Sequence, residues 1–131
     1  MHPRLESILG PILRDVARTC DVTLEVVDER WLPAVQQEFS FVVRDPSGSE
    51  TRVAIVGTQE LWQDIADTAE KMQEVAVEAL WFEAQRVAWP DCPHHSNTHP
   101  LEAAVVSARA VWRCPVTREV VAEIGSLTKS H

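Results

Sequence analysis

Apolar residues near the amino terminus recur every three or four positions, as they do along one face of an α-helix. The stripe consists of Leu5, Ile8, Leu9, Ile12, Leu13 and Val16. Charged residues, Asp15 among them, lie outside it, so we expect an amphipathic helix with its apolar face in the core. Gly10-Pro11 interrupts the pattern. Because proline has no N–H to donate, we expect either a kink there or a second helix that begins at Pro11.

Apolar and polar residues then alternate with the period of two that is typical of half-buried strands. The alternation covers residues 22–26, 38–43 and 51–56, and an Asp-Pro-Ser-Gly sequence suited to a tight turn occupies 45–48. The pattern predicts a three-stranded antiparallel meander. Trp31 falls between the first two stretches, where we expect a loop. There it would either be exposed as an anchor for a partner or fold onto the edge of the core.

Residues 59–88 contain neither proline nor glycine and are rich in Ala, Glu, Gln and Leu, which favours one long helix capped by Thr58. At 1.5 Å per residue it would be roughly 45 Å long, more than the core of so small a domain needs. Two apolar strips run along it: Leu61, Ile65, Ala69, Met72, Val75, Ala76 and Leu80 in the first, and Trp62, Ala66, Val77, Trp81 and Ala84 in the second. We expect one strip to cover the sheet. The other meets the first helix or a second copy of the chain in a homodimer, unless both strips are internal to the monomer.

The composition changes after Trp89-Pro90 to Pro, His, Ser and Asn, so we expect the helix to end and a loop to run to Pro100. Three short apolar stretches follow, and we interpret them as strands. They cover residues 105–107, 110–113 and 120–124.

Together these elements predict an α+β protein with a helix, a three-stranded antiparallel meander, a long helix and a small zinc-ribbon-like β-hairpin. A chain of 131 residues that is 45% hydrophobic can bury one ordinary core, but it is too short for two domains of typical size. We therefore expect a core domain over residues 1–88, and an appendage over residues 89–131 that contains the hairpin and a short tail.

The charge balance disfavours nucleic acid as a partner. The formal net charge is -8, and the 12 Lys and Arg residues are scattered among acidic ones. No apolar run approaches the roughly twenty residues needed to cross a bilayer, and residues 1–20 do not resemble a signal peptide. We expect a cytoplasmic protein with no membrane partner. Three cysteines, an odd number, argue against a disulfide framework and favour metal binding or burial.

The residues with the most distinctive chemistry lie between Trp89 and Pro115. Cys92 and His95 are separated by two residues, as the ligands of a zinc knuckle are, and His99 follows four positions later. Cys114 precedes a proline at the end of a predicted strand, like the second knuckle of a zinc ribbon. A complete ribbon would have its fourth ligand three positions later, where this chain has threonine. His99 is therefore needed to close the site.

We predict a structural Zn²⁺ site with the ligands Cys92, His95, His99 and Cys114. His94 is the substitute if the loop turns differently. In the alternative interpretation, Cys92 and Cys114 are buried thiols beside surface histidines, or they pair as a reversible disulfide. Cys20 has no ligand type nearby, and we expect it to be a small core residue.

A catalytic role for the metal is the less favoured interpretation. Hydrolytic zinc sites keep an open coordination position and a nearby carboxylate base, and the H-E-x-x-H motif is absent. Asp91 and Glu102 flank the cluster, so a zinc-dependent hydrolase that uses one of them is the alternative. A cysteine nucleophile fits less well, because the flanking prolines suit knuckle turns. Motifs for nucleotide binding and serine hydrolysis are also absent.

Trp81, Trp89 and Trp112 bracket the predicted metal loop. We expect them to pack into the core around the loop, exclude water and hold the ligands in place.

The segments CPHH, HPL, AVWRCP and VVAEIGSL of the carboxyl-terminal third together resemble a recurring segment of small uncharacterised proteins of high-GC bacteria. The resemblance covers residues 89–127 and implies a shared fold unit only. The order of helix, three strands and long helix is also similar to that of the small acidic chaperones of bacterial secretion systems. The metal loop and the missing final helix depart from that pattern.

These features favour a non-enzymatic protein-interaction module, such as an adaptor, an assembly factor or a chaperone-like protein. We expect it to present its sheet face or its long helix to another protein. The zinc-dependent hydrolase is the alternative function.

Overall fold

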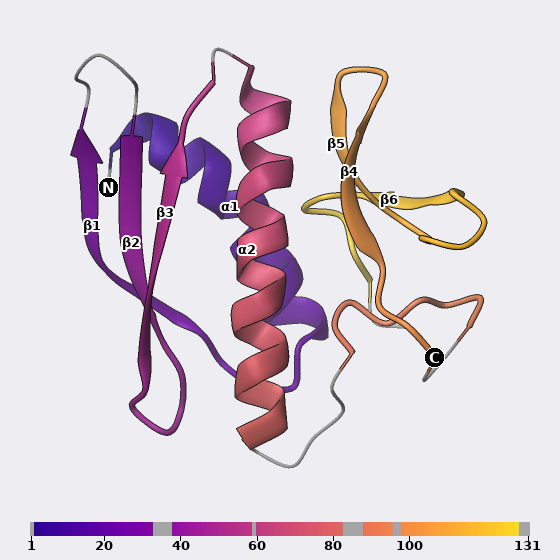
Figure 1. The fold of residues 1–131 in the computed structure, drawn as a ribbon, viewed down its shortest axis with the longest axis horizontal. Helices are drawn as coiled ribbons and strands as arrows, with labels where there is room; N and C mark the ends of the chain where they lie inside the picture. The colour runs from indigo at the N-terminus through magenta and orange to yellow at the C-terminus, as the bar shows by residue number, and fades with distance from the viewer. Residues whose placement is uncertain (1, 33–37, 59, 83–87, 96–97, 129–131) are drawn as a thin grey trace.

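The elements follow one another in the predicted order (Figure 1). The computed structural model describes residues 2–32, 38–58, 60–82, 88–95 and 98–128. It contains α1 (Pro3–Thr19), β1 (Glu25–Leu32), β2 (Glu38–Arg44), β3 (Glu50–Val56), α2 (Leu61–Phe82), β4 (Glu102–Val106), β5 (Arg109–Arg113) and β6 (Val120–Glu123). The α+β class is confirmed. The carboxyl-terminal strands form a three-stranded antiparallel sheet in the order β4-β5-β6, one strand more than a hairpin.

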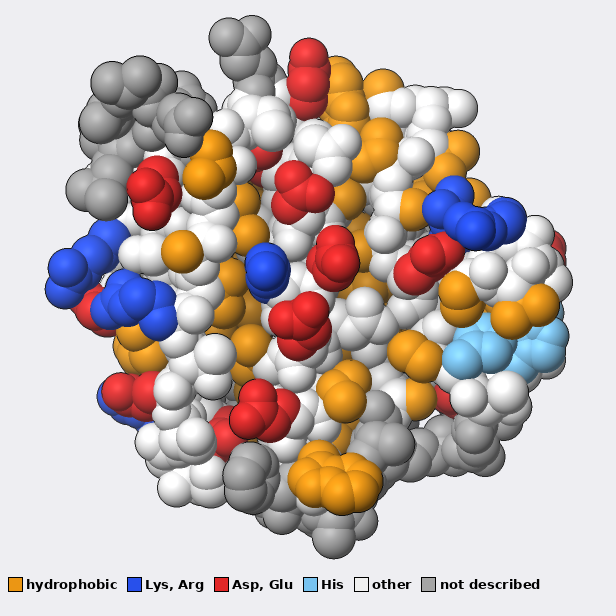
Figure 2. Space-filling model, in the orientation of Figure 1, with side chains coloured by type: hydrophobic (Ala, Val, Ile, Leu, Met, Phe, Trp, Pro, Cys, Tyr) orange, Lys and Arg blue, Asp and Glu red, His pale blue; other side chains and the backbone are white. Residues whose placement is uncertain are grey.

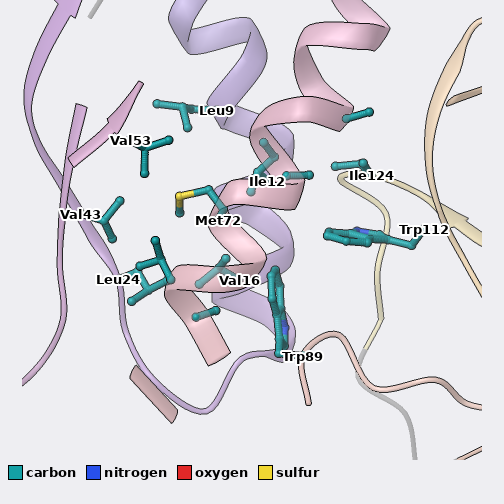
Figure 3. Close-up of a cluster of buried hydrophobic side chains, with 14 of the residues drawn as sticks. Leu9, Ile12, Val16, Leu24, Val43, Val53, Met72, Trp89, Trp112 and Ile124 are labelled. Atoms are coloured by element: carbon teal, nitrogen blue, oxygen red, sulfur yellow. The ribbon is translucent and has the colours of Figure 1, made fainter. Parts of the chain in front are cut away.

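The first sheet has the predicted meander order β1-β2-β3. The turn between β2 and β3 forms because the Asp45 carboxylate accepts hydrogen bonds from the Ser47 and Ser49 amides, at 2.9 and 3.1 Å. Alternate residues of the hairpin then face the helices. Figure 3 shows Val43 and Val53 of this sheet directed toward Leu9 and Met72, which come from α1 and α2.

Trp31 lies in β1, so the prediction of a loop at this position was wrong. The indole stacks on the ring of His2 at 4.2 Å between centroids and on Phe39 at 5.7 Å. The pairing of β1 with β2 shifts register between Val27 and Arg30. Such a bulge breaks the alternation of apolar and polar residues. The second half of the strand therefore could not be recognised from the sequence pattern.

The first helix is continuous through Pro11, so a second helix does not begin there. A proline inside a helix costs about 3 kcal/mol. The burial of one face of α1 offsets this cost, since Ile8, Leu9 and Ile12 are fully buried. The second helix begins at Leu61, and residues 83–87 of its predicted range lie outside the described residues, as does Ala84 of the second strip. Within the described ranges, neither helix is long and apolar enough to cross a lipid bilayer.

The second sheet contacts α2 through β4 and β5, and its buried residues join the same hydrophobic cluster as α1 and the first sheet. Figure 3 shows Trp112 and Ile124 on the side of the cluster away from the first sheet, with Trp89 near Val16. The boundary at residue 88 stays a prediction, but residues on both sides of it contribute to one core.

The buried carboxylate of Asp15 joins α1 to the carboxyl-terminal segment. It is fully buried, although the helical pattern placed it outside the core stripe. Its Oδ2 accepts hydrogen bonds from Trp112 Nε1 at 2.9 Å and from the Gly125 amide at 2.6 Å, and its Oδ1 accepts one from the Leu127 amide at 3.0 Å. The helical pattern gave no indication of this burial, because the partners of Asp15 are about a hundred residues away in the sequence.

Gly125 allows the chain to approach α1 closely enough for these bonds. It has a φ of +106°, and a Cβ at this position would lie 2.9 Å from Pro11 Cβ and from an Arg14 guanidinium nitrogen. The Arg14 guanidinium in turn donates a hydrogen bond to the Gly125 carbonyl at 3.0 Å. The position therefore requires glycine both for its backbone angle and for the lack of space.

Candidate metal centre

The loop that carries three of the predicted ligands is closed at its base by backbone pairing. Asp91 and Pro100 form an isolated antiparallel bridge, and the Leu101 amide donates to the Pro90 carbonyl at 2.7 Å. This base holds the two ends of the loop side by side, so that Cys92 near one end lies close to residues at the other.

The first two ligands are brought together by a turn. The His95 amide donates a hydrogen bond to the Cys92 carbonyl at 3.2 Å, and the Cys92 Sγ then lies 3.6 Å from His95 Nδ1. This is the local geometry that the C-x-x-H spacing predicted.

Cys114 enters from the end of β5 at the start of a second turn. The Arg118 amide donates to the Cys114 carbonyl at 2.8 Å, and Arg118 has a φ of 65°. The amide of Thr117 lies 3.5 Å from Cys114 Sγ and donates to it. Thr117 stands where a zinc ribbon would have its fourth ligand, and it contributes a backbone N–H to the sulfur in place of a metal-binding side chain.

The structure brings all four predicted residues together. One ligand atom from each of Cys92, His95, His99 and Cys114 lies within 4.8 Å of the others, and this group is close enough to hold a metal ion. Cys114 Sγ is 3.6 Å from His95 Nδ1 and 4.0 Å from His99 Nε2. Ordinary zinc bond lengths at a tetrahedral angle separate sulfur and nitrogen by about 3.6 Å. The spacing therefore fits an ion of this size, and both cysteines are free thiols.

A hydrogen bond sets the tautomer of His99. Its Nδ1 lies 3.0 Å from the Pro100 carbonyl oxygen, which can only accept, so Nδ1 carries the proton. The lone pair is then on Nε2, the ring nitrogen that faces Cys114. Such a partner on the far nitrogen is typical of metal-binding histidines, because it fixes the orientation of the ring.

The surroundings of Cys114 favour its thiolate form. Burial raises the pKa of this thiol, but hydrogen bonds from Thr117, from the Val116 amide and from Cys92 outweigh burial and lower the pKa to about 6. The thiolate is the form that binds metals. Cys20 differs, because burial raises the pKa of its thiol.

His94 lies outside the cluster. Its Nε2 is 3.6 Å from a Glu119 carboxylate oxygen, and its ring centroid is 6.5 Å from that of His95. The loop therefore turns so that His99, and not His94, approaches the sulfur of Cys114.

We expect His99→Ala to lose most of its bound metal and His94→Ala to keep one ion per chain. Alanine at 99 removes a ligand and leaves an open position, whereas alanine at 94 removes an exposed pair with Glu119 and no ligand. Elemental analysis after gel filtration measures the metal content of both variants. Equal loss in the two variants would contradict the assignment of His99.

The three tryptophans around the loop do not share one role. Trp89 and Trp112 are buried, as predicted, and their rings meet edge to face at 5.6 Å. The Trp89 indole also donates to Thr19 Oγ1 at 2.9 Å. Trp81 was expected in the core, but 70% of it is exposed. It lies on the last turn of α2.

Of the two carboxylates that could serve as a base for hydrolysis, that of Glu102 is paired with two arginines. Glu102 Oε1 accepts from Arg113 Nε at 3.2 Å and lies 3.6 Å from an Arg118 nitrogen. The backbone of Asp91 takes part in the bridge that closes the loop. Four protein ligand atoms are enough to fill a tetrahedral shell, and that is what a structural site requires. No protein-family model, curated protein or solved structure matches the chain.

Proposed function

We propose that this protein is a non-enzymatic protein-interaction module, such as an adaptor, an assembly factor or a chaperone-like protein, with a structural Zn²⁺ site. The observation that carries the proposal is the closed set of four ligand atoms, two of them on fully buried cysteines. Two thiolates and two imidazoles are a donor set that suits zinc and disfavours magnesium and calcium, which prefer oxygen.

The ion would stabilise the carboxyl-terminal unit. It would join the loop of residues 89–101 to the end of β5, as the knuckles of a zinc ribbon are joined. The free energy of metal binding at such a site contributes directly to folding. A surface that is held rigid in this way loses little conformational entropy when a partner binds, which favours association.

The hydrolase alternative has less support. It needs an open metal position and a free carboxylate base. Here four protein ligand atoms lie within 4.8 Å of one another, and Glu102 is paired with Arg113 and Arg118. X-ray absorption of the zinc-loaded protein separates the two functions. Two sulfur and two nitrogen ligands are expected, and an additional oxygen ligand from water would favour the hydrolase.

The interaction role is tested by affinity capture from a lysate of the native host with the zinc-loaded chain, followed by quantitative mass spectrometry. We expect one or a few proteins to be enriched, and to be displaced when untagged chain is added as a competitor. If no protein is both enriched and displaced, the proposed function is wrong.

A further inference from the structure

A groove with an apolar floor lies between α2 and the metal-binding loop. It has a volume of about 700 Å³ and opens to solvent. The apolar side chains that line it are Val77, Trp81, Pro100, Leu101 and Pro115. Most of Trp81 is exposed here. Large exposed aromatic side chains beside a pocket are typical anchors of protein interfaces.

The floor of the groove is built from residues next to the metal ligands. Pro100 and Leu101 follow His99 directly, and Pro115 follows Cys114. The Gln73 side chain donates to the Leu101 carbonyl at 2.6 Å and so joins the floor to α2. The groove is therefore formed before any partner arrives, and its shape depends on the metal site.

The rim of the groove is acidic. Glu70, Glu74 and Glu78 line it from α2 and Glu102 from β4, and no lysine or arginine is among the lining residues. Arg113 pairs with Glu102. Within the part of the chain that the structure describes, no ion pair involves the other three. Figure 2 shows acidic side chains gathered along α2, with a large apolar side chain near the lower end of this face.

This acidic row is unfavourable for the isolated helix. Glu70, Glu74 and Glu78 are spaced four residues apart, and like charges at this spacing destabilise a helix. Lys71 is exposed on the same helix but does not line the groove. The row therefore does not serve the stability of α2, but it would attract a positively charged partner.

Charge also disfavours a second copy of this chain that docks groove to groove. Two such grooves in contact would bring the carboxylates of both α2 helices together, and that repulsion opposes a dimer through this face. The spacing of one carboxylate per helical turn, about 6 Å along the axis, matches basic residues four apart on a partner helix.

We propose that this groove binds a basic amphipathic helix of another protein. The apolar side chains of that helix would pack on Trp81 and Val77, and its Lys or Arg residues would pair with Glu70, Glu74 and Glu78. This inference rests on the proposed interaction function, for which it names the site and the chemistry of the partner.

A synthetic probe tests the proposal directly. The probe is a fluorescein-labelled peptide of 18 residues with leucines on one helical face and lysines on the other, and its anisotropy is titrated with the zinc-loaded full chain. We expect Trp81→Ser and the double variant Glu74→Lys/Glu78→Lys each to weaken binding by roughly tenfold or more. A peptide with glutamate in place of lysine should not bind.

The control is the double variant Glu38→Lys/Glu123→Lys, which changes the net charge equally at two exposed positions outside the groove. We expect its affinity for the probe to stay within roughly twofold of the original chain, because neither position lines the groove and salt screens exposed charges. Thermal melts check that every variant folds. Failure of the original chain to bind the probe, or equal weakening by the two double variants, would overturn the proposal.

Affinity capture with the same variants separates this proposal from the proposed function. If Trp81→Ser and Glu74→Lys/Glu78→Lys capture the same competed proteins as the original chain, the groove is not the docking site, but the interaction function stands. If the original chain captures none while the probe binds with the expected dependence on the groove, the interaction function fails and the groove's preference for basic helices stands.

Discussion

Replacing Cys114 by serine is expected to abolish stoichiometric zinc binding and to lower the free energy of unfolding by about 4 kcal/mol. A ligand that is present at a thousand times its dissociation constant stabilises the folded state by about 4 kcal/mol. The variant loses this contribution because it does not bind zinc. Serine has nearly the same shape as cysteine, but its hydroxyl stays protonated and hard, so it is a poor zinc ligand. Cys114 is also fully buried and lies close to both histidines of the cluster.

Elemental analysis gives the zinc content, and urea unfolding with and without a chelator gives the stability. The chelator should shift the midpoint of the original chain toward that of Cys114→Ser and leave the variant unchanged, because the variant has no ion to lose. Cys20→Ser is the matched control, since Cys20 is a half-buried free thiol outside the cluster. It should keep one zinc per chain. A Cys114→Ser protein with full zinc content would contradict the site.

The sequence predicted those features that depend on neighbours in the chain. The stripe from Leu5 to Val16 and the alternation in β2 and β3 each repeat over several turns or residue pairs, so one irregular residue does not hide them. The ligand cluster was predictable for a related reason. Cys92 and His95 share one turn, and His99 lies close enough to them in the sequence to replace the missing fourth ligand of a zinc ribbon.

Features that depend on distant parts of the chain could not be predicted in this way. The exposure of Trp81 follows from which face of α2 the second sheet covers, and that is decided by the packing of β4 and β5. The sequence pattern places Trp81 on the second apolar strip of the helix, but it does not say which element packs against that strip. The groove beside it arises from α2, the loop and β4 together. It becomes visible only when these segments are placed in space.

The burial of Asp15 is the largest of these long-range effects, and it leads to a second strong prediction. Asp15→Ala is expected to lower the free energy of unfolding by about 3 to 5 kcal/mol, because it leaves three buried N–H donors without an acceptor. These donors are Trp112 Nε1 and the amides of Gly125 and Leu127. Urea unfolding measures the loss, and hydrogen exchange at the Gly125 and Leu127 amides should become faster.

Two further variants show whether the loss of the Asp15 carboxylate itself causes the lower stability of Asp15→Ala. Asp15→Asn keeps the shape of the side chain and one acceptor oxygen, but its NH₂ group faces one of the N–H donors. Its free energy of unfolding should therefore fall by less than that of Asp15→Ala, by about 2 kcal/mol. Asp21→Ala removes an exposed carboxylate just beyond α1 and should change the stability by less than about 0.5 kcal/mol. Zinc content should stay at one per chain in Asp15→Ala, because its hydrogen bonds reach β5 and the carboxyl-terminal segment but none of the four ligands. Equal stability of Asp15→Ala and Asp21→Ala would mean that the hydrogen bonds of Asp15 contribute little to the attachment of the carboxyl-terminal segment to α1.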